Sequence, residues 1–263
     1  MGNEDFGRLE IDWTKYFDRI WCVSFIPYAK RRDAIKREFD RIGISRHPNF
    51  QWNLTFDSPY FSMCKRVLDA NPSIGKLHST TELKCWAGHY SCIKKSVLFG
   101  DERVLIIEDD SRFLNDVSRM KLILEKMPKD YDIVLFDHFV NVSQGVYENY
   151  KSRKVNEFYS EYEDLDSCGC YSLSRKALLK LESLYDTMII PADNYTSKIP
   201  VPELKKCFSL TNLSCQATYS SSMSVSNAGV NTIHRVYSKS NIIYSEYNMN
   251  DGKPYTYGDF IES

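Results

Sequence analysis

The chain has 263 residues, with 34 Lys and Arg against 35 Asp and Glu and a formal net charge of −1. This length is sufficient for one large domain with a continuous core. The nearly neutral balance argues against a general nucleic-acid-binding protein, because such proteins are usually clearly basic. The composition also excludes disordered, collagen-like and coiled-coil classes, since 43% of the residues are hydrophobic and 26% are charged.

Targeting signals and stabilising disulfides are not expected in this sequence. No apolar run approaches the roughly 18–20 residues that a transmembrane helix needs. The first residues, MGNEDFGRLE, lack the basic and then apolar layout of a signal peptide. We therefore expect a cytoplasmic protein whose eight cysteines are reduced thiols. Because no CxxC pair occurs, a structural zinc site is not expected.

The first part of the chain begins with a strand and a helix. Residues 19–27 predict a buried strand that is ended by Pro27. Residues 29–42 have apolar positions at helical spacing and predict a helix, for which Gly43 is a stop signal. Residues 50–75 predict irregular structure.

Strands and helices continue to alternate beyond residue 80. The pattern predicts helices over 80–98 and 116–127 and buried strands over 104–107 and 133–136. This alternation favours an α/β fold with a mostly parallel central sheet flanked by helices. In such folds ligands bind at the carboxyl ends of the strands.

The second part of the chain is less regular. Residues 140–165 are polar and rich in tyrosine and predict a flexible loop, which a short strand and a helix with Ser174 as N-cap follow. Short strand-like pieces are expected from about residue 200. The aromatic and polar tail over 234–263 has no assignable structure.

The exposed face of the predicted helix at 29–42 is strongly basic. Such a face is either simply solvated or forms a basic rim beside an anionic ligand at the end of the preceding strand. In the second case Arg31 or Arg32 faces the ligand. Six residues form the face: Lys30, Arg31, Arg32, Lys36, Arg37 and Arg41.

Three consecutive carboxylates, Glu108, Asp109 and Asp110, follow the buried strand VLII. They repel one another, so keeping them ionised requires compensating positive charge. Oxygen ligands favour Mg²⁺ or Mn²⁺, and an extended backbone would point Glu108 and Asp110 to the same side of the strand. The alternative is an acidic strand end that pairs with Arg103 or Arg112.

Four blocks of the sequence resemble glycosyltransferase family 25, which includes lipooligosaccharide and collagen galactosyltransferases. The blocks read CVSFIPYAKRRDAIKREFDRIGI, TELKCWAGHYSCIKK, VLIIEDDSRFL followed by YDIVLF, and SCGCYSLSRKALLKL with PADNY downstream. The second block keeps the Glu, Cys and His of the family as Glu82, Cys85 and His89. It departs from the family at Lys84, where Gly is usual, and at Gly88, where Ser is usual.

The resemblance implies a single GT-A domain over 1–263, with a nucleotide-sugar-binding half at about 20–140 and an acceptor half at about 141–233. It implies an inverting, metal-dependent transfer of a hexose from UDP-galactose or UDP-glucose, with Mn²⁺ or Mg²⁺. The acceptor would be a cell-surface glycan or a lipooligosaccharide. A lipid-linked acceptor would allow peripheral contact of the tail with the inner membrane face.

Each residue type suggests a role in such a transfer. An inverting displacement needs a general base, for which Asp193 is favoured and Asp166 is the second candidate. Asp193 could instead cap a helix. Seven residues are expected to contact the sugar donor: Ser24, Arg31, Arg32, Glu82, His89, Glu108 and Asp109. Three are expected to bind the metal: Glu108, Asp110 and His234.

The histidines and Cys85 leave alternatives open. Cys85 and His89 share one predicted helix and could bind a metal, but a polar role for His89 and apolar packing of Cys85 are favoured. His138 lies near the expected ligand edge. His234 is either a metal ligand or a surface residue.

Two other functions fit the same motifs. One is a nucleotide-sugar-binding homologue that has lost catalysis, and the altered block around Lys84 and Gly88 is compatible with it. The other is a metal-dependent phosphohydrolase, because clustered carboxylates after a strand also serve that chemistry.

Overall fold

The computed structural model describes about three fifths of the chain: residues 11–25, 28–54, 62, 80–137, 153–162, 165, 168–187, 192–196, 201–210, 213–216, 247–248 and 253–254. Five α-helices are described: α1 (Ala29–Ile42), α3 (Thr80–Phe99), α4 (Val117–Glu125), α6 (Arg175–Thr187) and α7 (Ala192–Thr196). Two short 3-10 helices accompany them, Trp13–Lys15 and Ile44–Arg46.

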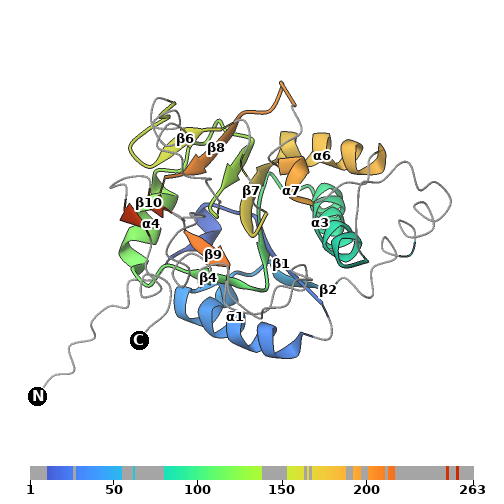
Figure 1. The fold of residues 1–263 in the computed structure, drawn as a ribbon, viewed down its shortest axis with the longest axis horizontal. Helices are drawn as coiled ribbons and strands as arrows, with labels where there is room; N and C mark the ends of the chain where they lie inside the picture. The colour runs from blue at the N-terminus through green and yellow to red at the C-terminus, as the bar shows by residue number, and fades with distance from the viewer. Residues whose placement is uncertain are drawn as a thin grey trace, which may run out of the picture.

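A seven-stranded sheet in the order β2-β1-β3-β7-β5-β8-β6 forms the centre of the molecule (Figure 1). Its strands are β1 (Arg19–Ser24), β2 (Phe50–Leu54), β3 (Arg103–Glu108), β5 (Ile133–Leu135), β6 (Tyr159–Glu161), β7 (Cys170–Ser174) and β8 (Lys206–Ser209). Five strands share one direction, whereas β7 and β6 run against them. The mostly parallel sheet that the sequence predicts is therefore interrupted by two antiparallel strands.

Two small antiparallel pairs lie outside the central sheet. β4 (Ser111–Phe113) pairs with β9 (Ser214–Gln216), and β10 (Tyr247–Asn248) pairs with β11 (Lys253–Pro254). The first pair starts directly after the acidic motif and brings a segment from about residue 214 close to it.

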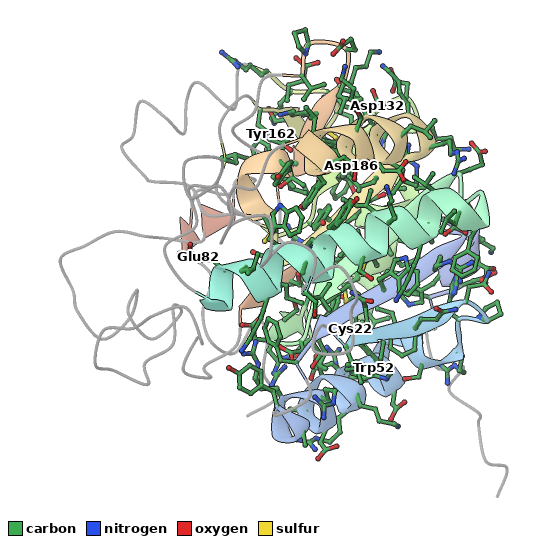
Figure 2. The ribbon with its side chains drawn as sticks, turned by 90° about the vertical axis from the view of Figure 1, so that its right-hand side faces the viewer. Cys22, Trp52, Glu82, Asp132, Tyr162 and Asp186 are labelled. Carbon is green, nitrogen blue, oxygen red and sulfur yellow. The ribbon has the colours of Figure 1, made fainter. Side chains whose placement is uncertain are left out.

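Side chains of the central strands alternate between two hydrophobic cores. In β3, Val104 and Ile106 pack with α3 and α6 on one face, and Leu105 and Ile107 pack with α1 and α4 on the other. This alternation is the period-2 pattern of a strand that is covered on both faces. Figure 2 shows α3 crossing one face of the sheet, so the protein is a three-layer α/β/α structure.

Local signals in the sequence set several helix ends. Helix α1 ends at Ile42 because Gly43 adopts a left-handed conformation with φ 88°. Asp116 caps α4 by accepting a hydrogen bond from the backbone N–H of Arg119. The predicted N-cap of α6 is confirmed, since Ser174 Oγ accepts from the N–H of Ala177 at 3.2 Å.

Two predicted irregular regions contain strands. β2 lies within 50–75, where an edge strand with mostly half-buried residues gives a weak pattern, and β6 lies within 140–165. Within the described ranges, no helix combines the length and apolar character that a membrane span requires.

Candidate active site

The acidic motif Glu108-Asp109-Asp110 lies at the carboxyl end of β3. The strand stops at Glu108, residues 109 and 110 form a turn, and β4 begins at Ser111. The extended backbone that would have placed Glu108 and Asp110 on one side is therefore absent here, and that part of the prediction is wrong. Glu108 continues the alternation of Val104 and Ile106 and so lies on the α3 side of the sheet.

Arg31 of α1 holds the two aspartates of the motif. Its Nη2 lies 2.5 Å from Asp109 Oδ1 and 2.6 Å from Asp110 Oδ2, and all three residues are buried. Arg31 thus has the role that the sequence alternative gave to Arg103 or Arg112. The positive charge that the motif requires is supplied within the protein by the helix directly after β1.

Ser24 and Arg32 complete this part of the site. Ser24, the last residue of β1, donates its hydroxyl proton to Asp109 Oδ2 over 2.5 Å. Arg32 is half-buried, donates to the carbonyl of Phe25 and lies 3.4 Å from Ser24 Oγ. The predicted donor-binding residues Ser24, Arg31, Arg32 and Asp109 therefore form one connected network.

Glu108 belongs to a second network on the α3 side. Its Oε1 lies 3.0 Å from His89 Nε2, 3.3 Å from Cys85 Sγ and 3.5 Å from Cys168 Sγ. The other ring nitrogen of His89, Nδ1, lies 2.8 Å from the hydroxyl of Tyr171 on β7. The imidazole is fully buried and is therefore held between β3 and β7.

Burial and neighbouring charges have opposite effects on the pKa values of the site residues. Burial raises the pKa of Asp110 to about 7 in spite of Arg31. Burial also raises the pKa of Asp109. Burial alone would lower the pKa of His89, but Cys85 and Glu108 outweigh it and raise the value to about 10. At neutral pH, Arg31 and His89 are therefore positively charged, and Asp110 titrates close to neutrality.

Asp137 is a buried carboxylate at the end of β5 that the sequence analysis did not single out. It packs against Gly169 so closely that a Cβ at that position would overlap Asp137 Oδ2. The carbonyl of Gly169 in turn accepts from the N–H of Glu108 at 2.8 Å and from Ser111 Oγ at 3.1 Å. The only signal for Asp137 in the sequence is its position directly after a buried strand.

A family comparison identifies the chain. The model of glycosyltransferase family 25 (LPS biosynthesis protein) matches residues 18–196, which are 179 of the 263 residues. The chain belongs to glycosyltransferase family 25. The match includes β1, the acidic motif and α3, so the residues of both networks lie within the family region. A search of curated proteins gives no match.

Solved structures resemble the glycosyltransferase only distantly. A mannose-1-phosphate geranyltransferase from Thermus thermophilus has a TM-score of 0.37 at 8% identity, covering 76% of this chain and 73% of the other. Mouse xyloside xylosyltransferase 1 in its apo form has a TM-score of 0.36 at 10% identity, covering 72% and 83%. The inositol-1-phosphate CTP transferase of T. maritima has 0.36 at 14% identity, covering 81% and 92%. At these scores the likenesses identify neither a ligand nor a reaction.

The remaining predicted residues of the glycosyltransferase lie at or beyond the limits of the described structure. Glu82 is half-buried in the first turn of α3 (Figure 2). The backbone of Asp193 lies within α7, so Asp193 is not the N-cap of that helix, and its side chain is outside the description. Three further residues lie outside the described residues: His138, Asp166 and His234.

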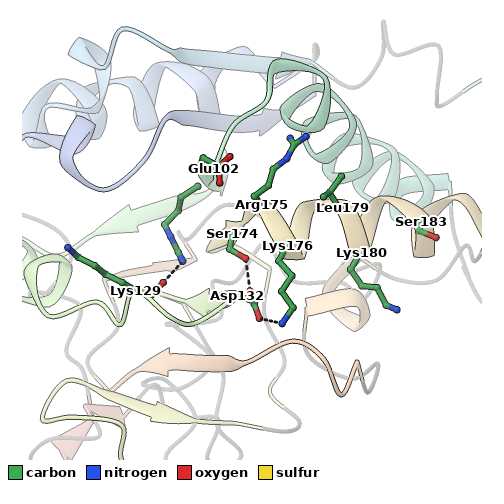
Figure 3. A pocket seen from close by; sticks show the side chains of 10 residues that line it. Glu102, Lys129, Asp132, Ser174, Arg175, Lys176, Leu179, Lys180 and Ser183 are labelled. Carbon is green, nitrogen blue, oxygen red and sulfur yellow. Dashed lines mark hydrogen bonds and ion pairs between the residues drawn. The ribbon is translucent and has the colours of Figure 1, made fainter.

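A cavity of about 790 Å³ lies at the opposite end of β3 from the acidic motif (Figure 3). Its lining includes Arg103, the first residue of β3, and several basic residues of α6. Lys176 in this cavity is paired with Asp132 at 3.1 Å. Because β3 rises about 3.3 Å per residue, the cavity is roughly 17 Å from Glu108 and is separate from the candidate active site.

Proposed function

We propose that this glycosyltransferase moves a hexose, galactose or glucose, from a UDP-sugar to a cell-surface glycan or lipooligosaccharide, with inversion at the sugar carbon. The observation that carries the proposal is the family membership of a chain whose acidic motif lies at the carboxyl end of β3, with both aspartates buried. Nucleotide-binding α/β sheets bind their ligands at this edge. We extend the proposal to a GT-A arrangement with a donor half at about 20–140 and an acceptor half at about 141–233.

The acidic motif fits a hard divalent cation such as Mn²⁺ or Mg²⁺. Asp110 Oδ1 is buried and has no hydrogen-bond partner among the residues that the structure describes, so this carboxylate oxygen is a candidate ligand. Asp109 and Asp110 offer only oxygen, which these cations prefer. In this proposal Asp110 and His234 hold the ion, which when bound would neutralise the charge of a diphosphate leaving group. Glu108, which the sequence offered as a third ligand, lies on the α3 side of the sheet and is not part of this set.

The side chains around the motif would bind and orient the donor. Arg31 fixes the two aspartates, and the neighbouring Arg32 lies 3.4 Å from Ser24 Oγ at the end of β1. Their positive charges favour an anionic ligand at this edge. Glu82 would contribute a further polar contact to the donor from α3. His89, expected from the sequence in the same role, is fully buried and both its ring nitrogens are engaged by Tyr171 and Glu108.

Asp193 is the proposed general base that takes the proton of the acceptor hydroxyl. The helix that carries it is firmly attached to α3, because Trp86 Nε1 donates to Tyr195 Oη at 2.9 Å. Tyr195 also stacks on Tyr185 of α6 with 3.6 Å between ring centroids. These contacts support a fixed position for α7 beside the helix of His89.

The first test combines ligand stabilisation and donor turnover. We expect UDP and Mn²⁺ together to raise the melting temperature more than either alone, and UDP-galactose or UDP-glucose to be slowly hydrolysed. Asp110→Asn should remove the Mn²⁺ effect, whereas Lys36→Ala on the exposed face of α1 should leave it unchanged. Stabilisation without any release of UDP would instead indicate a binding protein that has lost catalysis. No response to UDP would contradict the proposal, and phosphate release without transfer would indicate a phosphohydrolase.

A second test concerns the base. Asp193→Asn is expected to lower the rate of transfer by about 10²–10⁴-fold and to leave stabilisation by UDP and Mn²⁺ intact. Asp166→Asn is the comparison, because Asp166 is the other candidate. A wild-type transfer rate in the Asp193 variant would exclude Asp193 as the base.

A further part of the proposal concerns contact of the C-terminal tail with a membrane. If the acceptor is lipid-linked, the tail over 234–263 would contact the membrane surface from the cytoplasmic side. Co-sedimentation with anionic liposomes should then decrease when residues 234–263 are deleted. Unchanged co-sedimentation would count against this contact.

A further inference from the structure

Four side chains with metal-binding atoms meet on the α3 side of the sheet. Three of them offer sulfur or nitrogen, which Mg²⁺ and Mn²⁺ do not prefer. The four are Cys85, His89, Glu108 and Cys168. One ligand atom from each lies within 4.8 Å of the corresponding atoms of the others. The residues come from α3, from the end of β3 and from the segment just before β7, so the cluster is formed by the tertiary fold.

The spacing of these atoms is close to that of a tetrahedral site. Ligand bonds of about 2.0–2.3 Å to zinc imply roughly 3.3–3.8 Å between neighbouring ligand atoms. The three contacts of Glu108 Oε1, to His89, Cys85 and Cys168, are 3.0, 3.3 and 3.5 Å. The cluster therefore needs shifts of at most about 1 Å to enclose an ion, since its largest separation is 4.8 Å.

An independent contact orients the histidine for this role. His89 Nδ1 is engaged by the hydroxyl of Tyr171 at 2.8 Å, which directs Nε2 into the cluster. Metal-binding histidines commonly have their second ring nitrogen held by such a neighbour. The ring also lies parallel to Tyr171, with 22° between the planes, and is fully buried. The side chain is therefore held in place before any ion binds.

We propose that Cys85, His89, Cys168 and Glu108 form a metal site that binds zinc. Two thiolates and an imidazole select zinc over Mg²⁺ or Mn²⁺, which prefer oxygen. On binding, the ion would replace the hydrogen bonds of the cluster. The two thiol protons and the Nε2 proton of the His89 imidazolium would pass to solvent. The ion would then connect α3, β3 and the start of β7. This proposal does not depend on sugar transfer, since Asp109 and Asp110 are not among the ligands.

Cobalt substitution provides the test. The reduced, metal-free full-length protein should bind one Co²⁺, with strong visible bands and a thiolate-to-cobalt charge-transfer band in the near ultraviolet. One equivalent of Zn²⁺ should displace it, whereas excess Mg²⁺ should not. Cys85→Ser and Cys168→Ser should each remove the charge-transfer intensity in part. Each should also lower the affinity for zinc by at least about 10-fold, the lower end of the loss caused by removing an outer contact of a metal site.

Cys92→Ser is the matched control, because Cys92 is also a buried cysteine of α3 but is not in the cluster. It should keep the wild-type spectrum. If a cluster variant fails to fold, X-ray absorption of the zinc-loaded wild type should still show sulfur ligands at about 2.3 Å. Absence of stoichiometric binding, a spectrum unchanged by both cluster variants, or zinc bound only by oxygen and nitrogen would overturn the proposal.

Discussion

Replacing Arg31 with alanine is expected to destabilise the protein by about 3–5 kcal/mol, because the change leaves buried carboxylates without their cation. Arg31 Nη2 contacts Asp109 Oδ1 at 2.5 Å and Asp110 Oδ2 at 2.6 Å. The two aspartates are also buried, so bulk water screens their charges poorly. The estimate is far above that for an exposed ion pair, which contributes about 0–1 kcal/mol.

The pH dependence of the Arg31→Ala variant follows from the same carboxylates. Burial already raises the pKa of Asp110 to about 7 in the folded protein, above its ordinary value of 3.8. A carboxyl group with a raised pKa stabilises the fold at low pH, and this contribution is lost as the pH rises through the folded pKa. Without Arg31 the pKa rises further, so the loss of stability should be larger at about pH 8 than at about pH 5.

Urea denaturation of three variants at both pH values measures the effect. Lys36→Ala is the matched control, since Lys36 lies on the same helix but pairs with Asp40 at an exposed position, and it should change stability by less than about 0.5 kcal/mol. Adding Asp110→Asn to Arg31→Ala should recover part of the loss. A loss below about 1 kcal/mol for Arg31→Ala at about pH 8 would refute the reasoning.

Three further changes probe the surroundings of the site. Gly169→Ala should destabilise the protein by about 1–3 kcal/mol in urea, because the added Cβ overlaps the carboxylate of Asp137; an unchanged midpoint would contradict this packing. Asp116→Ala should cost about 1 kcal/mol in the same assay through loss of the α4 cap, and a neutral effect would count against that cap. In metal-free protein Cys85 and Glu108 raise the pKa of His89 to about 10, against 6.5 when unfolded. These contacts therefore stabilise the fold below pH 6.5, and the contribution disappears as the pH rises to 10. The melting temperature of the wild type should therefore fall between pH 6.5 and 10, and that of His89→Gln should change less. An identical decline in the wild type and the variant would exclude the effect.

Helices and buried strands were predictable from the sequence because their signals are local. The helix at 29–42 was predicted with its observed ends, since apolar spacing and a terminal glycine define it. β2 was missed because it is an edge strand whose residues are mostly only partly buried. Its pairing with β1 depends on tertiary contacts, which produce no regular spacing of hydrophobic residues in the sequence.

The site was predictable in part for the same reason. The acidic motif and the basic turn before α1 are contiguous in sequence, and their meeting at the carboxyl ends of β1 and β3 follows from parallel pairing. The approach of Cys168 to Glu108 does not follow from spacing. It depends on the antiparallel register of β3 and β7, in which Ile107 lies opposite Cys170.

The register of β3 explains why one acidic motif has two chemistries. Strand alternation directs Glu108 toward α3, where sulfur and nitrogen atoms surround its carboxylate. The turn that follows directs Asp109 and Asp110 toward α1, where Arg31 provides the positive charge. Consequently a change in Arg31 should perturb the oxygen-rich half and leave zinc binding by the other half intact. Because Glu108 is bonded to Asp109, the two halves remain close enough for both to border the same ligand edge.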